Sequence, residues 1–214
     1  MSWEEVKENY RKNLKHFLSL LEDKKLLRES ITTPIYSNDN LKIINFHHSQ
    51  VRKGITQLIE RTDKITDEKL SIGEFTEFVI LLRTYEFIMR IEYSKDLLVE
   101  MLDKNKFNSN IEEVSLGVVI KKINNKLYPL DEKTEKEKIA LNQIRNINRD
   151  LFYVDFRNAI VHRKYKLDGT ELFYNDYDGN QVYIDNSKFN EMNRLLIQLE
   201  VILGSKYNDL ANRK

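Results

Sequence analysis

Along most of the chain, apolar residues recur every three or four positions, which is the spacing of the buried face of an α-helix. This pattern predicts helices at about residues 3–29, 41–59, 71–103, 111–127, 135–161 and 188–202. Three of the expected starts have the capping-box spacing of Ser or Thr before Glu, at Ser2 and Glu5, Ser71 and Glu74, and Thr134 and Glu137. Ser187 is the expected cap of the last helix. Helix breakers are scarce, with two prolines and six glycines, so the helices should be long.

The period of the hydrophobic pattern changes from helical to alternating after the fifth predicted helix. Residues 171–174 and 181–184 alternate between apolar and polar positions, and Asp178-Gly179 lies between them. An Asp-Gly pair between two alternating runs is a strong hairpin signal. The sequence therefore predicts an all-α fold, a helical bundle of about six helices with one small β-hairpin between the last two helices.

The length allows one substantial hydrophobic core without disulfides or metals. No repeat or low-complexity linker divides the sequence. We expect an N-terminal helical extension at residues 1–66 that packs on the core, a main helical domain at 67–208, and a polar tail at 209–214.

The composition bears on where the protein is located and on how it could contact nucleic acid. The chain has no cysteine, which excludes disulfides, thiolate zinc sites and a cysteine nucleophile, and this favours a cytoplasmic location. The N-terminus lacks the features of a signal peptide, and no apolar run approaches the roughly 18 residues of a membrane span. The net charge is +1, so any contact with nucleic acid must come from a local cluster of basic residues.

Residues 155–166, at the end of the fifth predicted helix, contain most of the candidate catalytic and RNA-binding residues. Asn158 and His162 are four positions apart and share a helix face, whereas Arg157 and His162 are about 140° apart around the axis. A long arginine side chain can still bend toward that face, so all three residues can meet one phosphate.

These residue types suit metal-free cleavage of RNA by its own 2′-hydroxyl group. A histidine titrates near neutral pH and can move protons to or from ribose oxygens. Arg157 would bind the phosphate and stabilise the extra charge of the transition state, and Asn158 would orient the histidine or the phosphate. The need for a 2′-hydroxyl would make the activity specific for RNA. We expect no metal and no cofactor.

The spacing of arginine and histidine alone is not specific, because Arg11 and His16 have it too. The second match differs in three ways: asparagine directly follows the arginine, the segment precedes a hairpin, and basic residues follow the histidine. These basic residues, Arg163, Lys164 and Lys166, are the candidate RNA contacts.

The run Arg157-Asn158-Ala159-Ile160-Val161-His162 resembles the R-N-x3-H motif of the HEPN superfamily, whose all-helical domains occur in bacterial toxins, phage-defence systems and RNA-processing factors. The resemblance also includes the order of helices over roughly residues 71–205. It implies a metal-independent endoribonuclease that acts as a homodimer, with the two motifs facing each other in one composite site.

By the same resemblance, Arg157, Asn158 and His162 are the functional residues, and an acidic residue on the long helix, Glu86 or Glu92, completes the site. An antitoxin or regulatory protein is a possible partner. Many members of the superfamily have lost catalysis and serve as RNA-binding or dimerisation modules, so this alternative stays open.

A purely structural interpretation also stays open. Arg157 would then pair with an acid such as Asp155 or Glu171, and His162 would be favoured by its place at a helix C-terminus. The chain would be a helical scaffold or dimerisation protein. His47-His48 is a weak candidate for a metal site, since adjacent helical residues point about 100° apart.

Overall fold

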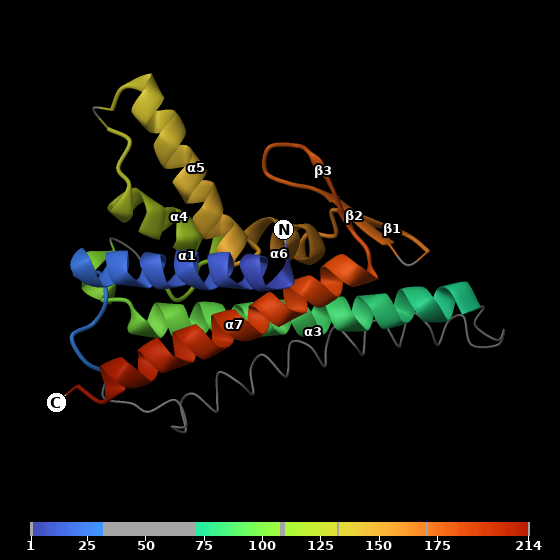
Figure 1. Ribbon diagram of the computed structural model, residues 1–214, viewed down its shortest axis with the longest axis horizontal. Coiled ribbons are helices and arrows are strands. Elements are labelled where there is room, and N and C mark those ends of the chain that lie inside the picture. Colours follow the sequence, from blue (N-terminus) through green and yellow to red (C-terminus); the bar gives the residue numbers. More distant parts are fainter. Residues whose placement is uncertain (1, 32–71, 108–109, 132, 170, 214) are drawn as a thin grey trace. The chain divides into compact units, whose positions relative to one another are not determined.

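The computed structural model describes residues 2–31, 72–107, 110–131, 133–169 and 171–213, and this part of the chain is mostly helical (Figure 1). Its α-helices are α1 (Trp3–Asp23), α3 (Ile72–Met101), α4 (Leu116–Leu127), α5 (Glu135–Leu151), α6 (Val154–Val161) and α7 (Asn186–Ala211). A 3-10 turn, η1 (Lys104–Lys106), follows α3, and three strands lie between α6 and α7: β1 (Tyr165–Asp168), β2 (Glu171–Asn175) and β3 (Gln181–Ile184). The helix predicted at 41–59 lies outside the described residues.

The chain forms two compact units that alternate along the sequence. Of the described residues, unit 1 contains 2–31, 94–107, 110–131, 133–155 and 195–213, and unit 2 contains 72–93, 156–169 and 171–194. The long helices α3 and α7 each contribute residues to both units. The expected boundary between 66 and 67 falls outside the described residues and stays a prediction.

Unit 1 is built on the amphipathic helix α1. Ser2 and Glu5 form the expected capping box, and Phe17 and other apolar side chains at helical spacing are fully buried. Phe17 makes an edge-to-face contact with Phe152, which directly follows α5. The Tyr10 hydroxyl donates to the carbonyl of Leu151 at 2.7 Å, and burial raises the pKa of Tyr10 far above its ordinary value, so this donor stays protonated.

Unit 2 combines the first part of α3, α6, the sheet and the start of α7. The sheet is antiparallel in the order β1-β2-β3, and Leu172 lies opposite Leu167 on one side and Ile184 on the other (Figure 1). Leu172 and Ile184 are buried, whereas Lys166 and Tyr183, one position along, lie on the opposite face and are exposed. This alternation gives the sheet one core face and one outer face.

The sheet corrects the prediction of a single hairpin. The two predicted strands pair as β2 and β3, but β1 extends the sheet on the other side of β2. Strand β1 has no counterpart among the predicted elements, because the basic segment of the sequence ends at Lys166, the second residue of β1. Gly169 and Gly179, in the two turns, have φ angles of 57° and 83°, where a residue without Cβ is preferred.

Two helix ends also differ from the prediction. The first helix ends at Asp23 rather than near residue 29, because Lys25 takes a left-handed conformation with φ 53°. The predicted fifth helix is two helices, α5 and α6, separated at Tyr153 with φ 49°. Neither position is glycine or proline, so the residue type gives no break signal.

The last helix begins and ends differently from the expectation. The Asp185 carboxylate accepts the Lys188 N–H at 2.7 Å, so Asp185 performs the capping role assigned to Ser187. The helix continues to Ala211, beyond its expected end near residue 202, and Leu210 is buried.

Candidate active site

The candidate motif lies on α6, which is anchored through one apolar face. Phe156, Ala159 and Ile160 are at most 4% exposed and have helical spacing. The Phe156 ring packs edge-to-face between Phe87 of α3 and Tyr174 of β2, with ring centroids 5.5 and 5.7 Å apart. This packing fixes the rotation of α6 and so determines where the adjacent Arg157 and Asn158 lie.

Arg157 forms the central polar contact of the site. Its Nε donates to Glu92 Oε1 on α3 at 2.5 Å, and its Nη1 donates to Asn158 Oδ1 at 3.2 Å. The side chains of Arg157 and Glu92 are 12% and 17% exposed, so water screens this ion pair only in part. Three residues thus form one hydrogen-bonded group, and the guanidinium is held in a single orientation.

His162 lies one turn further along, at the end of α6. The backbone N–H of His162 donates to the backbone carbonyl of Asn158 at 3.0 Å, while the His162 side chain is exposed. Within the described part of the chain, the imidazole has no hydrogen-bond or ion-pair partner. The structure therefore joins Arg157 to Asn158 and leaves the His162 ring in contact with solvent.

The end of α6 is a Schellman motif built on an arginine. The Lys164 N–H donates to the Ala159 carbonyl at 2.7 Å, and the Arg163 N–H donates to the Ile160 carbonyl at 3.1 Å. Arg163 occupies the position that usually carries glycine and has φ 55°. A non-glycine residue in this region costs on the order of 1 kcal/mol, so Arg163 adopts this conformation at an energetic disadvantage.

The three basic residues after His162 lie close together in sequence and are all exposed. Arg163 and Lys164 connect α6 to β1, and Lys166 lies on the outer face of the sheet opposite Phe173. Among the described residues, none of the three forms an ion pair. Their charges are therefore available to an anionic ligand next to His162.

The structural interpretation named the wrong acidic partners for Arg157. Asp155 instead pairs with Arg149, and Glu171 accepts a hydrogen bond from the Tyr183 hydroxyl, which raises the pKa of Tyr183. Of the two acids considered for the site, Glu92 contacts Arg157 and Glu86 is exposed. The sequence does not distinguish the two acids, because each lies next to a buried apolar residue, Phe87 or Ile91.

The other histidine candidates contribute no further site. His16 lies exposed on α1, and Arg11 of the same spacing pairs with Glu8 at 3.9 Å. His47 and His48 lie outside the described residues. In the described ranges, no three His, Asp or Glu side chains gather in a way that would hold a metal ion, and no helix there has the length and apolarity of a membrane span.

Comparisons with known proteins leave the site to be judged on its own geometry. No family model matches the sequence, and neither the curated proteins nor the solved structures yield a significant match.

Proposed function

We propose that the protein is a metal-independent endoribonuclease of HEPN type, with Arg157, Asn158 and His162 as its catalytic residues. The observation that carries this proposal is the arrangement on α6. Arg157 is held by Glu92 and Asn158, while His162, one turn beyond Asn158, and the cations that follow it are exposed. RNA cleavage without a metal requires an oriented cation that binds the phosphate and an imidazole that can exchange protons with the ribose oxygens, and this segment offers both residue types.

The proposed role of Arg157 follows from which of its guanidinium N–H groups already donate hydrogen bonds within the protein. Nε and Nη1 are engaged with Glu92 and Asn158, and Nη2 has no partner among the described residues. Nη2 is therefore the donor for a non-bridging phosphate oxygen. Because the guanidinium is already oriented, binding the pentacovalent transition state requires little reorganisation.

The reaction needs two proton transfers. The 2′-hydroxyl loses its proton to a base as O2′ bonds to phosphorus, and the P–O5′ bond breaks as O5′ takes a proton from an acid. The products are a 2′,3′-cyclic phosphate and a 5′-hydroxyl. Each chain has one motif histidine, so a homodimer that brings two copies of His162 to one phosphate would supply both the base and the acid.

The test is incubation of purified protein with mixed RNA in excess EDTA, beside Arg157→Ala and His162→Ala. We expect wild-type protein to cleave, and each variant to lose about 100-fold or more in rate, as removal of a general acid–base or transition-state donor does. His16→Ala is the matched control, because His16 is exposed and has the same spacing from Arg11 as His162 has from Arg157. Intact RNA with wild-type protein, or equal loss in the control, would contradict the proposal.

One observation favours a second function. Arg157 is largely buried and already paired with an acid, which is also how an arginine with a purely architectural role behaves. A catalytically silent module would then bind RNA or a partner protein through Arg163, Lys164 and Lys166. It would retain uncleaved RNA, lose affinity when these cations are replaced, and be indifferent to His162→Ala.

A cleaving enzyme of this type fits a toxin or a phage-defence effector. Uncontrolled cleavage of RNA would harm the host cell, so an antitoxin or regulatory protein belongs to this proposal.

A further inference from the structure

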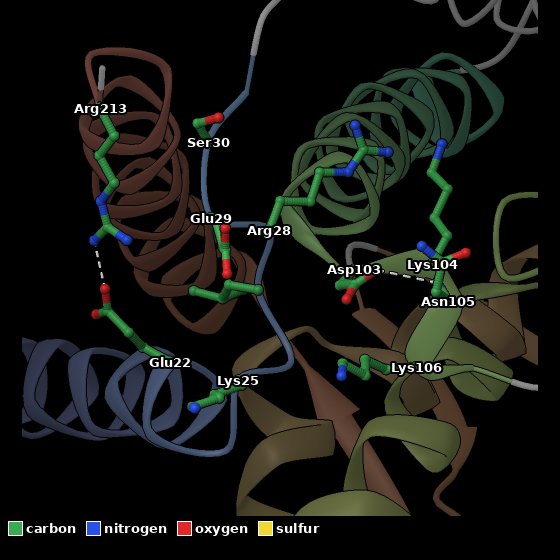
Figure 2. A pocket seen from close by; sticks show the side chains of 11 residues that line it. Glu22, Lys25, Arg28, Glu29, Ser30, Asp103, Lys104, Asn105, Lys106 and Arg213 are labelled. Atoms are coloured by element: carbon green, nitrogen blue, oxygen red, sulfur yellow. Dashed lines mark hydrogen bonds and ion pairs between the residues drawn. The ribbon is translucent and has the colours of Figure 1, made fainter.

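Unit 1 has a groove that plays no part in the proposed RNA cleavage. It is lined by side chains from residues 22–30 and 103–106 and by Arg213, and its volume is about 750 Å³ (Figure 2). We call it the basic groove. Small-molecule sites usually have volumes of roughly 300–1,000 Å³, so the groove has the size of a nucleotide site.

Backbone hydrogen bonds fix the walls of the basic groove. The Arg28 N–H donates to the Met101 carbonyl at 2.9 Å, and the Asp103 N–H donates to the Leu26 carbonyl at 2.8 Å, which joins the segment after α1 to the end of α3. The Asp103 carboxylate accepts the Asn105 N–H at 3.2 Å and so shapes the η1 turn. A ligand would therefore meet a site that is formed before binding.

The lining includes five basic and three acidic side chains. Two of the acids are engaged by the protein itself: Asp103 caps η1, and Glu22 accepts from Lys206 at 2.5 Å and from Arg213. These two hydrogen bonds lower the pKa of Glu22, so the carboxylate is ionised and its charge is compensated. Glu29 is the remaining acid.

Two of the cations have no compensating acid. Arg28 and Lys104 lie near Glu100, at 3.8 and 3.5 Å, and Lys104 also pairs with Glu112. In the described chain, Lys25 and Lys106 form no ion pair. They line the groove from different segments, the end of α1 and the η1 turn, as Figure 2 shows.

Lys25 occupies a position where a lysine is unfavourable for the backbone. It has φ 53°, and the Schellman bonds from Lys25 to Glu22 and from Leu26 to Leu21, both 2.8 Å, place it where glycine is usual. Its charge is favourable near a helix C-terminus, but that benefit alone is small and is screened by water. An anionic ligand in the groove gives the lysine a larger role.

We propose that the basic groove binds a small ligand that carries several phosphates, such as a nucleoside polyphosphate, and that Lys25 and Lys106 are its principal phosphate contacts. Both ammonium groups can donate charge-assisted hydrogen bonds to phosphate oxygens. The Glu29 carboxylate repels the same ligand, so removing its charge should strengthen binding. The proposal does not depend on RNA cleavage.

The experiment is calorimetric titration of the full chain in the His162→Ala background, in low salt with EDTA. The ligands are ATP, inorganic tripolyphosphate, adenosine and a 2′-O-methyl RNA oligonucleotide without terminal phosphates. We expect binding of ATP and tripolyphosphate, and none of adenosine. Binding of ATP but not tripolyphosphate would identify a nucleotide site, and equal binding would identify a site for phosphate chains alone.

Three variants test the residues. Lys25→Gln with Lys106→Gln should weaken ATP binding about tenfold or more, since two charge-assisted contacts are lost. Glu29→Gln should strengthen it severalfold by removing repulsion. Lys12→Gln with Lys15→Gln removes two exposed lysines of α1 that do not line the groove and should have no effect. If the double substitution disturbs folding, Lys106→Gln alone should still weaken binding.

Several results would overturn the proposal. The first is that the protein without groove substitutions binds neither ATP nor tripolyphosphate. The second is that Lys12→Gln with Lys15→Gln weakens ATP binding as much as Lys25→Gln with Lys106→Gln does. The third is that Glu29→Gln binds ATP more weakly. Binding of the RNA oligonucleotide through Lys25 and Lys106 without any binding of ATP would also overturn it, because the groove would then be part of an RNA surface.

Discussion

Arg157 connects the fold and the candidate chemistry at the scale of single residues. Its guanidinium is 12% exposed and shares hydrogen bonds with Glu92 and Asn158. Removing the acid would leave a largely buried charge without its partner, which costs more than the pair contributes as a whole. The contribution of the Arg157–Glu92 pair to stability can therefore be measured by substituting each residue alone and both together.

We expect Glu92→Ala to lower the free energy of unfolding by about 1–3 kcal/mol. Adding Arg157→Ala should cost less than the sum of the two single substitutions, because the second change removes the unpaired charge. Urea denaturation of the four proteins measures this coupling. Glu86→Ala, an exposed acid on the same helix, is the control and should change stability by less than about 0.5 kcal/mol. Strictly additive losses would mean that the contact is energetically unimportant.

Arg163 gives a second prediction at this scale, one that separates folding from activity. Its φ of 55° suits glycine, so Arg163→Gly should be more stable than Arg163→Ala by about 1 kcal/mol. Both variants remove the same charge and should weaken RNA binding equally. Thermal unfolding and RNA affinity, measured side by side, test this. Equal stability of the two variants would show that the helix end relaxes to accommodate a side chain.

At the scale of elements, α6 depends on its apolar face. Phe156→Ala removes the ring that packs between Phe87 and Tyr174 and should destabilise unit 2 by about 3–5 kcal/mol. Val161→Ala, on the same helix but 46% exposed, should change stability by less than about 1 kcal/mol. Chemical denaturation followed by circular dichroism distinguishes them. Similar losses for both would mean that α6 is not held through Phe156.

The sequence predicted most elements of the described chain because their signals are local. Helical spacing and the capping boxes at Ser2 and Thr134 located α1 and α5, and alternation with Asp178-Gly179 located β2 and β3. The ends at Lys25 and Tyr153 were missed because both residues take a left-handed conformation, and neither residue type gives warning of it. Strand β1 was missed because its residues, Tyr165–Asp168, directly follow the basic end of the helix, and their own composition does not reveal their pairing with β2.

In the candidate site, too, local features could be predicted from the sequence and contacts between distant residues could not. The motif residues on α6 could be chosen from the sequence, but the partner of Arg157 lies 65 positions away on α3. Which face of α3 meets α6 depends on the packing of Phe87 and Phe156, and no local pattern specifies that contact. Structure was therefore needed to select Glu92 rather than Glu86.

At the scale of the whole molecule, the two ends of the chain are joined through Glu22. Its carboxylate binds Lys206 and Arg213, which are 184 and 191 positions further along. These hydrogen bonds lower the pKa of Glu22 below its ordinary value of 4.5. A carboxyl whose pKa is depressed by folding contributes its full stabilisation above its ordinary pKa, and loses it as the pH falls through the folded pKa.

We therefore expect acid to weaken the wild-type protein more than Glu22→Gln. Above about pH 5 the wild type should be the more stable of the two, and the difference should shrink as the pH falls below about 4.5. Melting temperatures from pH 7 to pH 3 measure it. A difference between the two proteins that does not change over this range would show that the contacts of Glu22 contribute nothing to its titration.

The measurement that tests the proposed function most directly is the fate of a single RNA linkage. An oligonucleotide that wild-type protein cleaves in EDTA is compared with the same strand carrying one 2′-deoxynucleotide on the 5′ side of the cut. We expect loss of cleavage at that linkage only, and a 2′,3′-cyclic phosphate with a 5′-hydroxyl from the unmodified strand, read by mass spectrometry. Cleavage of the deoxy linkage, or a 5′-phosphate product, would contradict 2′-hydroxyl attack and the roles assigned to Arg157 and His162.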